Sequence, residues 1–306
     1  MSDLHHYIPR FYLNEFTDPE VPQGQEPYLW IFKFESKKWK RKAPVNVASK
    51  KDFYTLTDGE GKKHNEIERA LSALESKTAL IFRDKIFKRN ALLSEEKAVI
   101  AEFIAVMMTR IPKSHNRINT FVSNIATLVM EMYQSRPEAV KEIKKWYEKE
   151  TGKKLPENLN ETCFDPSKYE IIASKSFLLK AMINSINKIT KALYYMNWTF
   201  LHSIENELFI TSDNPVHIWH PKSKTSTYPR GLIHQHVEVT LPLCRQICFL
   251  ASWNKEIRTH IDISQSDVEE LNQRRIWASD KFIISSQNDF LGSKYLQYKL
   301  KSKSKE

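Results

Sequence analysis

The chain has 306 residues, of which 41% are hydrophobic and 27% are charged, so it can bury a large core without a metal or a disulfide. Its three cysteines argue against a secreted disulfide framework, and its six glycines form neither of the common nucleotide-binding loops. The formal net charge of +10 makes nucleic acid a candidate partner, because a basic surface attracts polyanions.

The first residues show neither the basic nor the apolar region of a signal peptide. No apolar run approaches the roughly 20 residues that a transmembrane helix needs. We therefore expect a cytoplasmic protein without membrane contact. Part of the basic excess falls in residues 293–306, which we expect to form a disordered tail.

The first third predicts a β-hairpin over residues 28–42, because apolar residues alternate up to a polar turn and the chain returns through Trp39. The lysines and the arginine around Trp39 fit either contact with nucleic acid or a solvated strand edge. A short strand and a turn are expected over residues 52–61.

The middle third predicts helices, since apolar residues recur there every three or four positions. Ser94, which two glutamates follow, is expected to cap one of these helices. The expected helices cover residues 65–89, 94–109, 115–133, 141–150 and 167–196.

The last third changes to the period of strands, with one helix that Ser266 and Glu269 are expected to begin as a capping box. The expected strands cover residues 198–202, 208–211, 237–241, 247–251 and 282–285. This order predicts an α+β fold in one domain over residues 1–292. A central helical layer or bundle would pack on a mostly antiparallel sheet from the C-terminal third, together with the N-terminal hairpin.

Two histidines near the N-terminus form the first group of candidate site residues. His5 and His6 can relay protons near neutral pH or bind a metal, and Tyr7 and Arg10 beside them can orient or stabilise an anion. The alternative is structural: the rings pack against the core while neighbouring apolar residues anchor the terminus.

The segment Thr211–Pro215 forms the second group. It places the Ser212 hydroxyl, the Asp213 carboxylate and the Asn214 amide at the end of an expected strand, where catalytic carboxylates often lie. The alternative is a turn in which Asp213 or Asn214 accepts local backbone N–H groups.

Several segments resemble one bacterial family, domain of unknown function 4238. They are HHYIPRFYLNEF from His5, FYT from Phe53, NEIERALSALES from Asn65, RIP from Arg110, ITSDNPV from Ile210 and LPL from Leu241. The family implies no activity. The resemblance implies a shared design that includes these polar residues: His5, His6, Tyr7, Arg10, Glu75, Arg110, Ser212, Asp213 and Asn214.

Two functional hypotheses follow. In the first, the protein is a hydrolase that acts on nucleic acid, of a toxin or phage-defence type, with a divalent metal as a candidate cofactor. Its catalytic residues would be His5, His6, Asp213 and Arg110, and its substrate-binding residues Tyr7, Arg10, Ser212 and Asn214. In the second, the same residues line a cleft of a non-enzymatic module that binds a nucleotide, a nucleic acid or a protein.

Two weaker signals remain. Arg110 and His115 have the Arg-x4-His spacing of helical RNase toxins, although Pro112 interrupts it. The four histidines His217, His220, His234 and His236 could ligate zinc, although no cysteine lies among them. The sequence leaves the oligomeric state open.

Overall fold

The computed structural model describes residues 4–57, 62–154, 169–204, 208–220, 231–255, 258–288, 296 and 299–300. Two units are distinguished by their internal contacts. One comprises Met1–Lys113 with Met182–Glu306, and the other comprises Ser114–Ala181. Helices and mainly antiparallel strands together confirm the predicted α+β class. No described helix combines the length and apolar character required to cross a bilayer.

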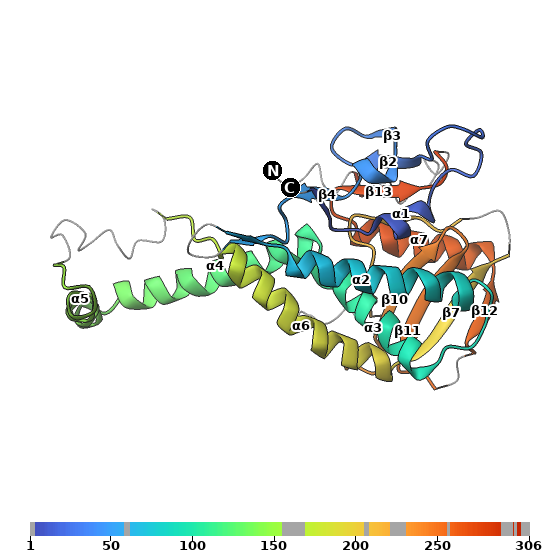
Figure 1. Cartoon of the computed structure of the whole chain (residues 1–306). Helices are drawn as coiled ribbons and strands as arrows, with labels where there is room; N and C mark the ends of the chain where they lie inside the picture. The colour runs from blue at the N-terminus through green and yellow to red at the C-terminus, as the bar shows by residue number, and fades with distance from the viewer. Residues whose placement is uncertain are drawn as a thin grey trace. The chain divides into compact units, whose positions relative to one another are not determined.

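A five-stranded sheet forms much of the first unit (Figure 1). Its central strands are apolar on both faces: six of the seven residues of Glu238–Cys244 are buried, as expected for strands covered on both sides. All neighbours are antiparallel except one parallel pair, β12 with β7. The order is β12 (His260–Ile263), β7 (Asn197–Ser203), β11 (Ile247–Ser252), β10 (Glu238–Cys244) and β9 (His217–Trp219).

A four-stranded sheet joins the two ends of the sequence. The predicted N-terminal hairpin is confirmed as β2 (Leu29–Lys33) and β3 (Lys38–Lys42), and β2 pairs with β13 (Phe282–Ser285). β13 in turn pairs with β8 (Thr211–Ser212). The strands after Trp198 are therefore divided between two sheets. The predicted strand over 208–211 is reduced to β8, because only its last residue joins a ladder.

The described part of the first unit contains four complete helices, α1 (Arg10–Asn14), α2 (Glu66–Ile81), α3 (Ser94–Thr109) and α7 (Gln265–Ala278). It also contains the larger part of α6 (Lys175–Tyr195), from Met182 onward. The predicted helix over 65–89 changes after Ile81 into a π-helical turn, Phe82–Ile86. The predicted cap at Ser94 is wrong by one residue: Leu93 is the N-cap, and its N–H donates to Glu96 at 2.8 Å.

The capping box of α7 also lies earlier than predicted. Ser264, not Ser266, is the N-cap, and its hydroxyl accepts the N–H of Asp267. The physical reason is backbone geometry. Ser264 has an extended conformation (φ −73°, ψ 165°), which a cap residue requires, whereas Ser266 already belongs to the helix.

Short strands complete the first unit. β1 (Leu4–His6) pairs with β4 (Ser49–Lys51), and β5 (Leu56–Thr57) pairs with β6 (Lys63–His64). A single 3-10 turn, Pro44–Asn46, precedes β4. β1 thus brings the two N-terminal histidines beside a segment that lies well beyond the first hairpin in the chain.

The second unit is helical. It contains most of α4 (Pro112–Gln134), all of α5 (Pro137–Thr151) and the first residues of α6 (Lys175–Tyr195). α5 ends at Gly152, whose positive φ of 66° suits glycine. α6 begins later than the predicted residue 167, because the hydroxyl of Ser174 accepts the N–H of Phe177 and so caps the helix.

Most of the basic segment 293–306 lies outside the described residues. Leu296 is buried in a cluster with Phe34 and Ile283. The buried ammonium of Lys299 donates to carbonyl groups of Ile276, Trp277 and Ser279. These carbonyls lie at the C-terminal end of α7, where a cation is favoured.

Candidate functional site

The N-terminal segment from His5 to Leu13 is largely buried, as the structural alternative for this terminus expects. Ile8 and Leu13 are buried, and the hydroxyl of buried Tyr12 bonds to Thr211 Oγ1 of β8 at 2.7 Å. Successive side chains of a strand point to opposite faces. Accordingly, His5 and Tyr7 are buried, whereas His6 between them is only partly buried.

His5 makes contacts that are typical of a structural residue. Its ring stacks on Tyr54, with centroids 5.7 Å apart and an interplanar angle of 6°. Its Nδ1 accepts the backbone N–H of Tyr54 at 3.0 Å. Because an accepting nitrogen carries no proton, the proton of the neutral ring is on Nε2.

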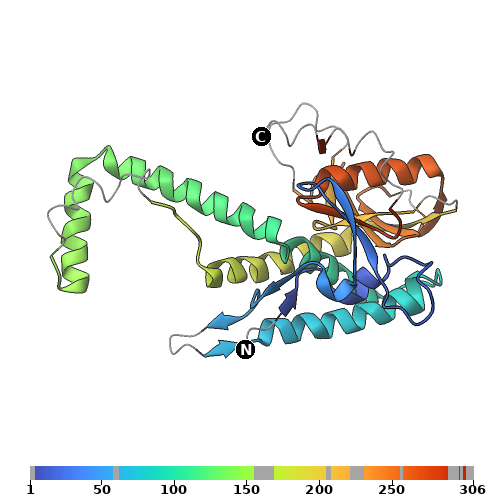
Figure 2. The same ribbon diagram turned by 90° about the horizontal axis from the view of Figure 1, so that it is seen from above.

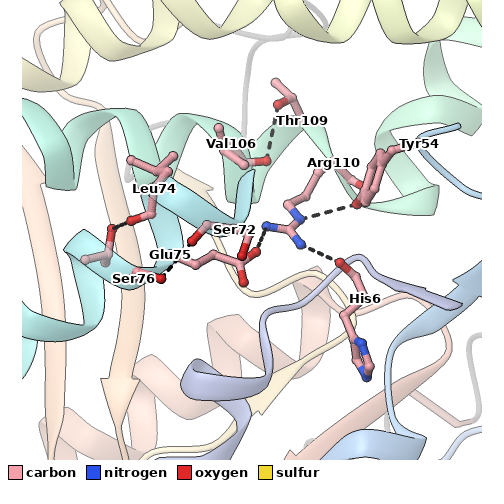
Figure 3. A network of polar contacts seen from close by, with 10 residues as sticks. His6, Tyr54, Ser72, Leu74, Glu75, Ser76, Val106, Thr109 and Arg110 are labelled. Atoms are coloured by element: carbon pink, nitrogen blue, oxygen red, sulfur yellow. Dashed lines mark hydrogen bonds and ion pairs between the residues drawn. The ribbon is translucent and has the colours of Figure 1, made fainter. Parts of the chain in front are cut away.

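Arg110 lies at the centre of a network that joins three segments (Figure 3). Its side chain is 1% exposed, and Nη1 donates to Glu75 Oε1 at 2.7 Å. Nη2 donates to the His6 carbonyl, and Nε donates to the Tyr54 hydroxyl. Burial acts to lower the pKa of Arg110, but Tyr54 and Glu75 outweigh it and raise the pKa.

Beside this network lies a cleft of about 320 Å³. Its polar lining combines an imidazole, two guanidinium groups, two carboxylates and two hydroxyls. The described residues that line it are His6, Arg10, Phe11, Glu68, Ser72, Glu75, Ser76, Ala79 and Arg110. Four of the nine polar residues that the family resemblance singled out therefore belong to the network or line the cleft: His6, Arg10, Glu75 and Arg110.

His6 is the imidazole residue among those that line this cleft. Its Nε2 lies 3.0 Å from the Val45 carbonyl oxygen, which can only accept, so Nε2 carries the proton and Nδ1 of the neutral ring has the lone pair. Burial is the main cause that lowers the pKa of His6, and the Arg10 and Arg110 charges lower it further. His6 is therefore a neutral base near pH 7.

Asp213 has different surroundings. Its two carboxylate oxygens accept the backbone N–H groups of Asp280, at 2.8 Å, and Lys281, at 2.6 Å. Burial raises the pKa of Asp213, although these two donors act in the opposite direction. Asp213 is not among the described residues that line the cleft. Its contacts connect the end of β8 to the loop between α7 and β13.

The neighbours of Asp213 complete a bonded turn. The Ser212 hydroxyl accepts the Asn214 N–H at 3.1 Å and donates to the Asn214 carbonyl at 3.0 Å. The Asn214 amide donates to the Ala278 carbonyl at 2.8 Å. Tyr7 follows β1 and lies near enough to this turn for the Asp213 charge, after burial, to raise its pKa. The structure thus places Tyr7 and Ser212–Asn214 together, in a group other than the cleft.

The two weaker signals receive little support. α3 ends at Thr109 and α4 begins at Pro112, so Arg110 and His115 do not lie on one continuous helix. His220 Nε2 lies 2.9 Å from His234 Nδ1, but part of that loop, 221–230, lies outside the described residues. In the part of the chain that the structure describes, no three His, Cys, Asp or Glu residues form a group suited to a metal ion.

Sequence reasoning missed three polar residues of the cleft, Glu68, Ser72 and Ser76. Their spacing of four residues places them on one face of α2. The sequence contains this signal: Glu75 lies three residues after Ser72, and Ala79 lies four residues after Glu75, so both belong to the same face. The apolar positions of α2 predict its buried side, whereas the polar residues on the other side have no apolar periodicity that marks them.

Comparison with known proteins supplies a family without a described activity. No curated protein and no solved structure matches the chain. The family described as "Protein of unknown function (DUF4238)" matches residues 4–289. This match includes every residue of the cleft and of the Asp213 turn. The chain therefore belongs to the DUF4238 family.

Proposed function

We propose that the protein is a nucleic-acid hydrolase that cleaves RNA in the cleft beside α2. This proposal rests on one observation: His6, a neutral base, and the exposed Arg10 line the same polar cleft. RNA fits these groups because its 2′-hydroxyl is an internal nucleophile that needs only a base to act. The basic net charge of the chain supports a polyanionic substrate.

In the proposed reaction, His6 Nδ1 accepts the proton of the 2′-hydroxyl. The 2′-oxygen attacks phosphorus, a new P–O2′ bond forms, and the P–O5′ bond breaks. The leaving 5′-oxygen takes a proton from water, and the hydroxide formed accepts the proton held by His6, which gives a 2′,3′-cyclic phosphate and a 5′-hydroxyl. Arg10 stabilises the charge that develops on the phosphoryl oxygens.

Arg110 has a positioning role in this proposal. It is 1% exposed, and its three nitrogens donate to Glu75, the His6 carbonyl and Tyr54. In Figure 3 the His6 ring points away from the guanidinium, whereas the His6 carbonyl faces it. Arg110 therefore holds the backbone of β1 at His6, while the bond from Nε2 to the Val45 carbonyl orients the His6 ring.

A binding module is the second candidate. The observation that favours it is that Arg110 and Asp213 already use their polar atoms within the protein. Among the described residues that line the cleft, only Arg10 then remains as an exposed cation. Such a cleft could recognise a phosphate group of a nucleotide or an RNA without cleaving it.

The test incubates purified protein with labelled RNA, single-stranded DNA and duplex DNA, each with magnesium, manganese or a chelator. We expect cleavage of RNA in all three conditions, and none when a 2′-deoxynucleotide replaces the nucleotide before the cleaved bond. His6→Gln should reduce the rate by about 10²–10⁴-fold, the usual contribution of a general base. Glutamine can still donate to the Val45 carbonyl, so the local structure is retained.

The matched control is His236→Gln, which removes an exposed histidine outside the cleft. It should leave cleavage unchanged. Salt-dependent RNA binding without cleavage by the wild-type protein would favour the binding module. Cleavage that His6→Gln leaves intact would refute the assigned base, and cleavage abolished by the chelator would require a metal instead of an acid–base site.

A further inference from the structure

Helix α4 carries an apolar stripe with the spacing of a coiled coil. Ile118, Phe121, Ile125, Leu128 and Met132 follow one another at intervals of three, four, three and four residues. These are the a and d positions of a heptad repeat, which lie along one line of a helix and pack against a partner helix.

Four of the five side chains in this stripe are exposed, and the fifth, Ile118, is partly buried. Phe121 is 65% exposed, Ile125 46%, Leu128 56% and Met132 51%. On the other side of the helix, Ser123, Ala126 and Thr127 are partly buried, whereas Val129, next to Leu128 in the sequence, is also 41% exposed. A typical monomer exposes no apolar patch larger than roughly 300–600 Å². Four large side chains in a row, each about half exposed, approach that limit.

The described parts of the second unit contact α4 away from the stripe. The side-chain oxygen of Asn119, which lies outside the a/d line, accepts the Ala173 N–H at 2.7 Å. α5 turns away from the end of α4 and does not run back along it (Figures 1 and 2). The described part of the second unit therefore leaves the apolar line of α4 open to another helix.

Two charged residues identify the partner and its direction. Within residues 116–132 the only acidic or basic side chains are Arg117 and Glu131, and both are exposed. Each precedes an a position, so both occupy g positions, which flank the a/d line and select partners. They lie at opposite ends of the stripe and have opposite charges. A second α4 in the antiparallel direction brings Arg117 of one chain to Glu131 of the other, at both ends.

We propose that two copies of this chain associate through an antiparallel pair of α4 helices. The stripe is complementary to itself, as a two-fold symmetric interface requires. A stripe of five side chains is small beside the roughly 20–30 residues that each partner contributes to a standard interface. The dimer is therefore weak and reversible, with a dissociation constant on the order of micromolar.

Sedimentation of the full chain from about 1 to 100 µM tests this association. We expect monomer at the lowest and dimer at the highest concentration. Leu128→Asp should raise the dissociation constant at least tenfold, whereas Thr120→Asp, an exposed c position outside the stripe, should not change it. Because Leu128 is mostly exposed, its replacement should leave the melting temperature and circular dichroism unchanged.

A charge exchange tests the direction. Glu131→Arg should weaken the dimer several-fold in low salt, because it places two arginines together at each end. Adding Arg117→Glu to this variant should restore the affinity. Monomer at every concentration, or a dimer that Leu128→Asp leaves intact, would overturn the interface. A dimer that is insensitive to both charge variants would overturn the antiparallel direction.

Discussion

Replacing Arg110 by methionine removes a buried cation from the network that joins β1, α2 and α3. The variant leaves the Glu75 carboxylate, the His6 carbonyl and the Tyr54 hydroxyl without their shared donor. Breaking a buried ion pair on one side costs about 3–5 kcal/mol. The Glu75 side chain is 24% exposed, so water can partly solvate it, and we expect a loss near the lower limit of about 3 kcal/mol.

This loss can be measured by thermal and urea unfolding. A change of 1 kcal/mol shifts the melting temperature by about 2–4 °C in a unit of this size, so Arg110→Met should lower it by roughly 6–12 °C. The matched control is Arg83→Met. Arg83 forms an ion pair with Asp84 at 2.7 Å, but its side chain is 66% exposed, and we expect the melting temperature of this variant to stay unchanged.

A double-mutant cycle separates the ion pair from the lost packing. Glu75→Leu alone leaves a buried guanidinium without its carboxylate, so it should also destabilise the protein. In the double variant Arg110→Met/Glu75→Leu neither charge remains. It should therefore be more stable than the sum of the single losses predicts, by at least about 1 kcal/mol. If Arg110→Met has no larger effect than Arg83→Met, the network does not stabilise the N-terminal segment.

Two further predictions concern stability. Removing residues 1–13 should clearly lower the melting temperature, since each fully buried large side chain, such as Ile8, Tyr12 or Leu13, contributes roughly 1.5–3 kcal/mol; an unchanged melting curve would contradict the observed anchoring. Burial, followed by the charges of Arg275 and Arg274, lowers the pKa of His217 from 6.5 to about 3. The unfolded chain then binds a proton as pH falls below 6.5 while the folded protein does not, so this stability is complete above pH 6.5 and is lost towards pH 3. Between pH 7.5 and pH 5, wild-type protein should lose about 2 kcal/mol more unfolding free energy than His217→Gln; equal losses in urea unfolding would show that His217 is not buried in its neutral form.

Several elements could be predicted from the sequence because their signals are local. β10 and β11 are runs of apolar residues that are buried on both faces, and the hairpin β2–β3 alternates around a polar turn. The N-terminal anchor is similar, since the proline and aromatic residues after His6 mark a buried segment. The predicted helix starts were wrong where one side-chain hydrogen bond decides which of several neighbouring residues caps the helix. Ser264 caps α7 in place of Ser266, and Ser174 caps α6.

The candidate site could be predicted only in part. The sequence singled out His5, His6, Arg10, Arg110 and Asp213 as one polar set, because polar residues in shared motifs are poorly suited to simple packing. The structure divides this set. His6, Arg10 and Arg110 line the cleft, His5 stacks in the core, and Asp213 accepts two backbone N–H groups elsewhere.

The sequence by itself determined the α+β class, the basic charge and the residue types available for chemistry, because composition and periodicity are properties of short segments. Only the tertiary structure decided which of those residues meet. Arg110 bonds the carbonyl of His6 across 104 residues of sequence, and Glu75 across 35. Such contacts depend on how β1, α2 and α3 pack together, and no local pattern encodes that packing. The structure also decided that α4 leaves its apolar line exposed, since periodicity predicts an apolar face but not what covers it.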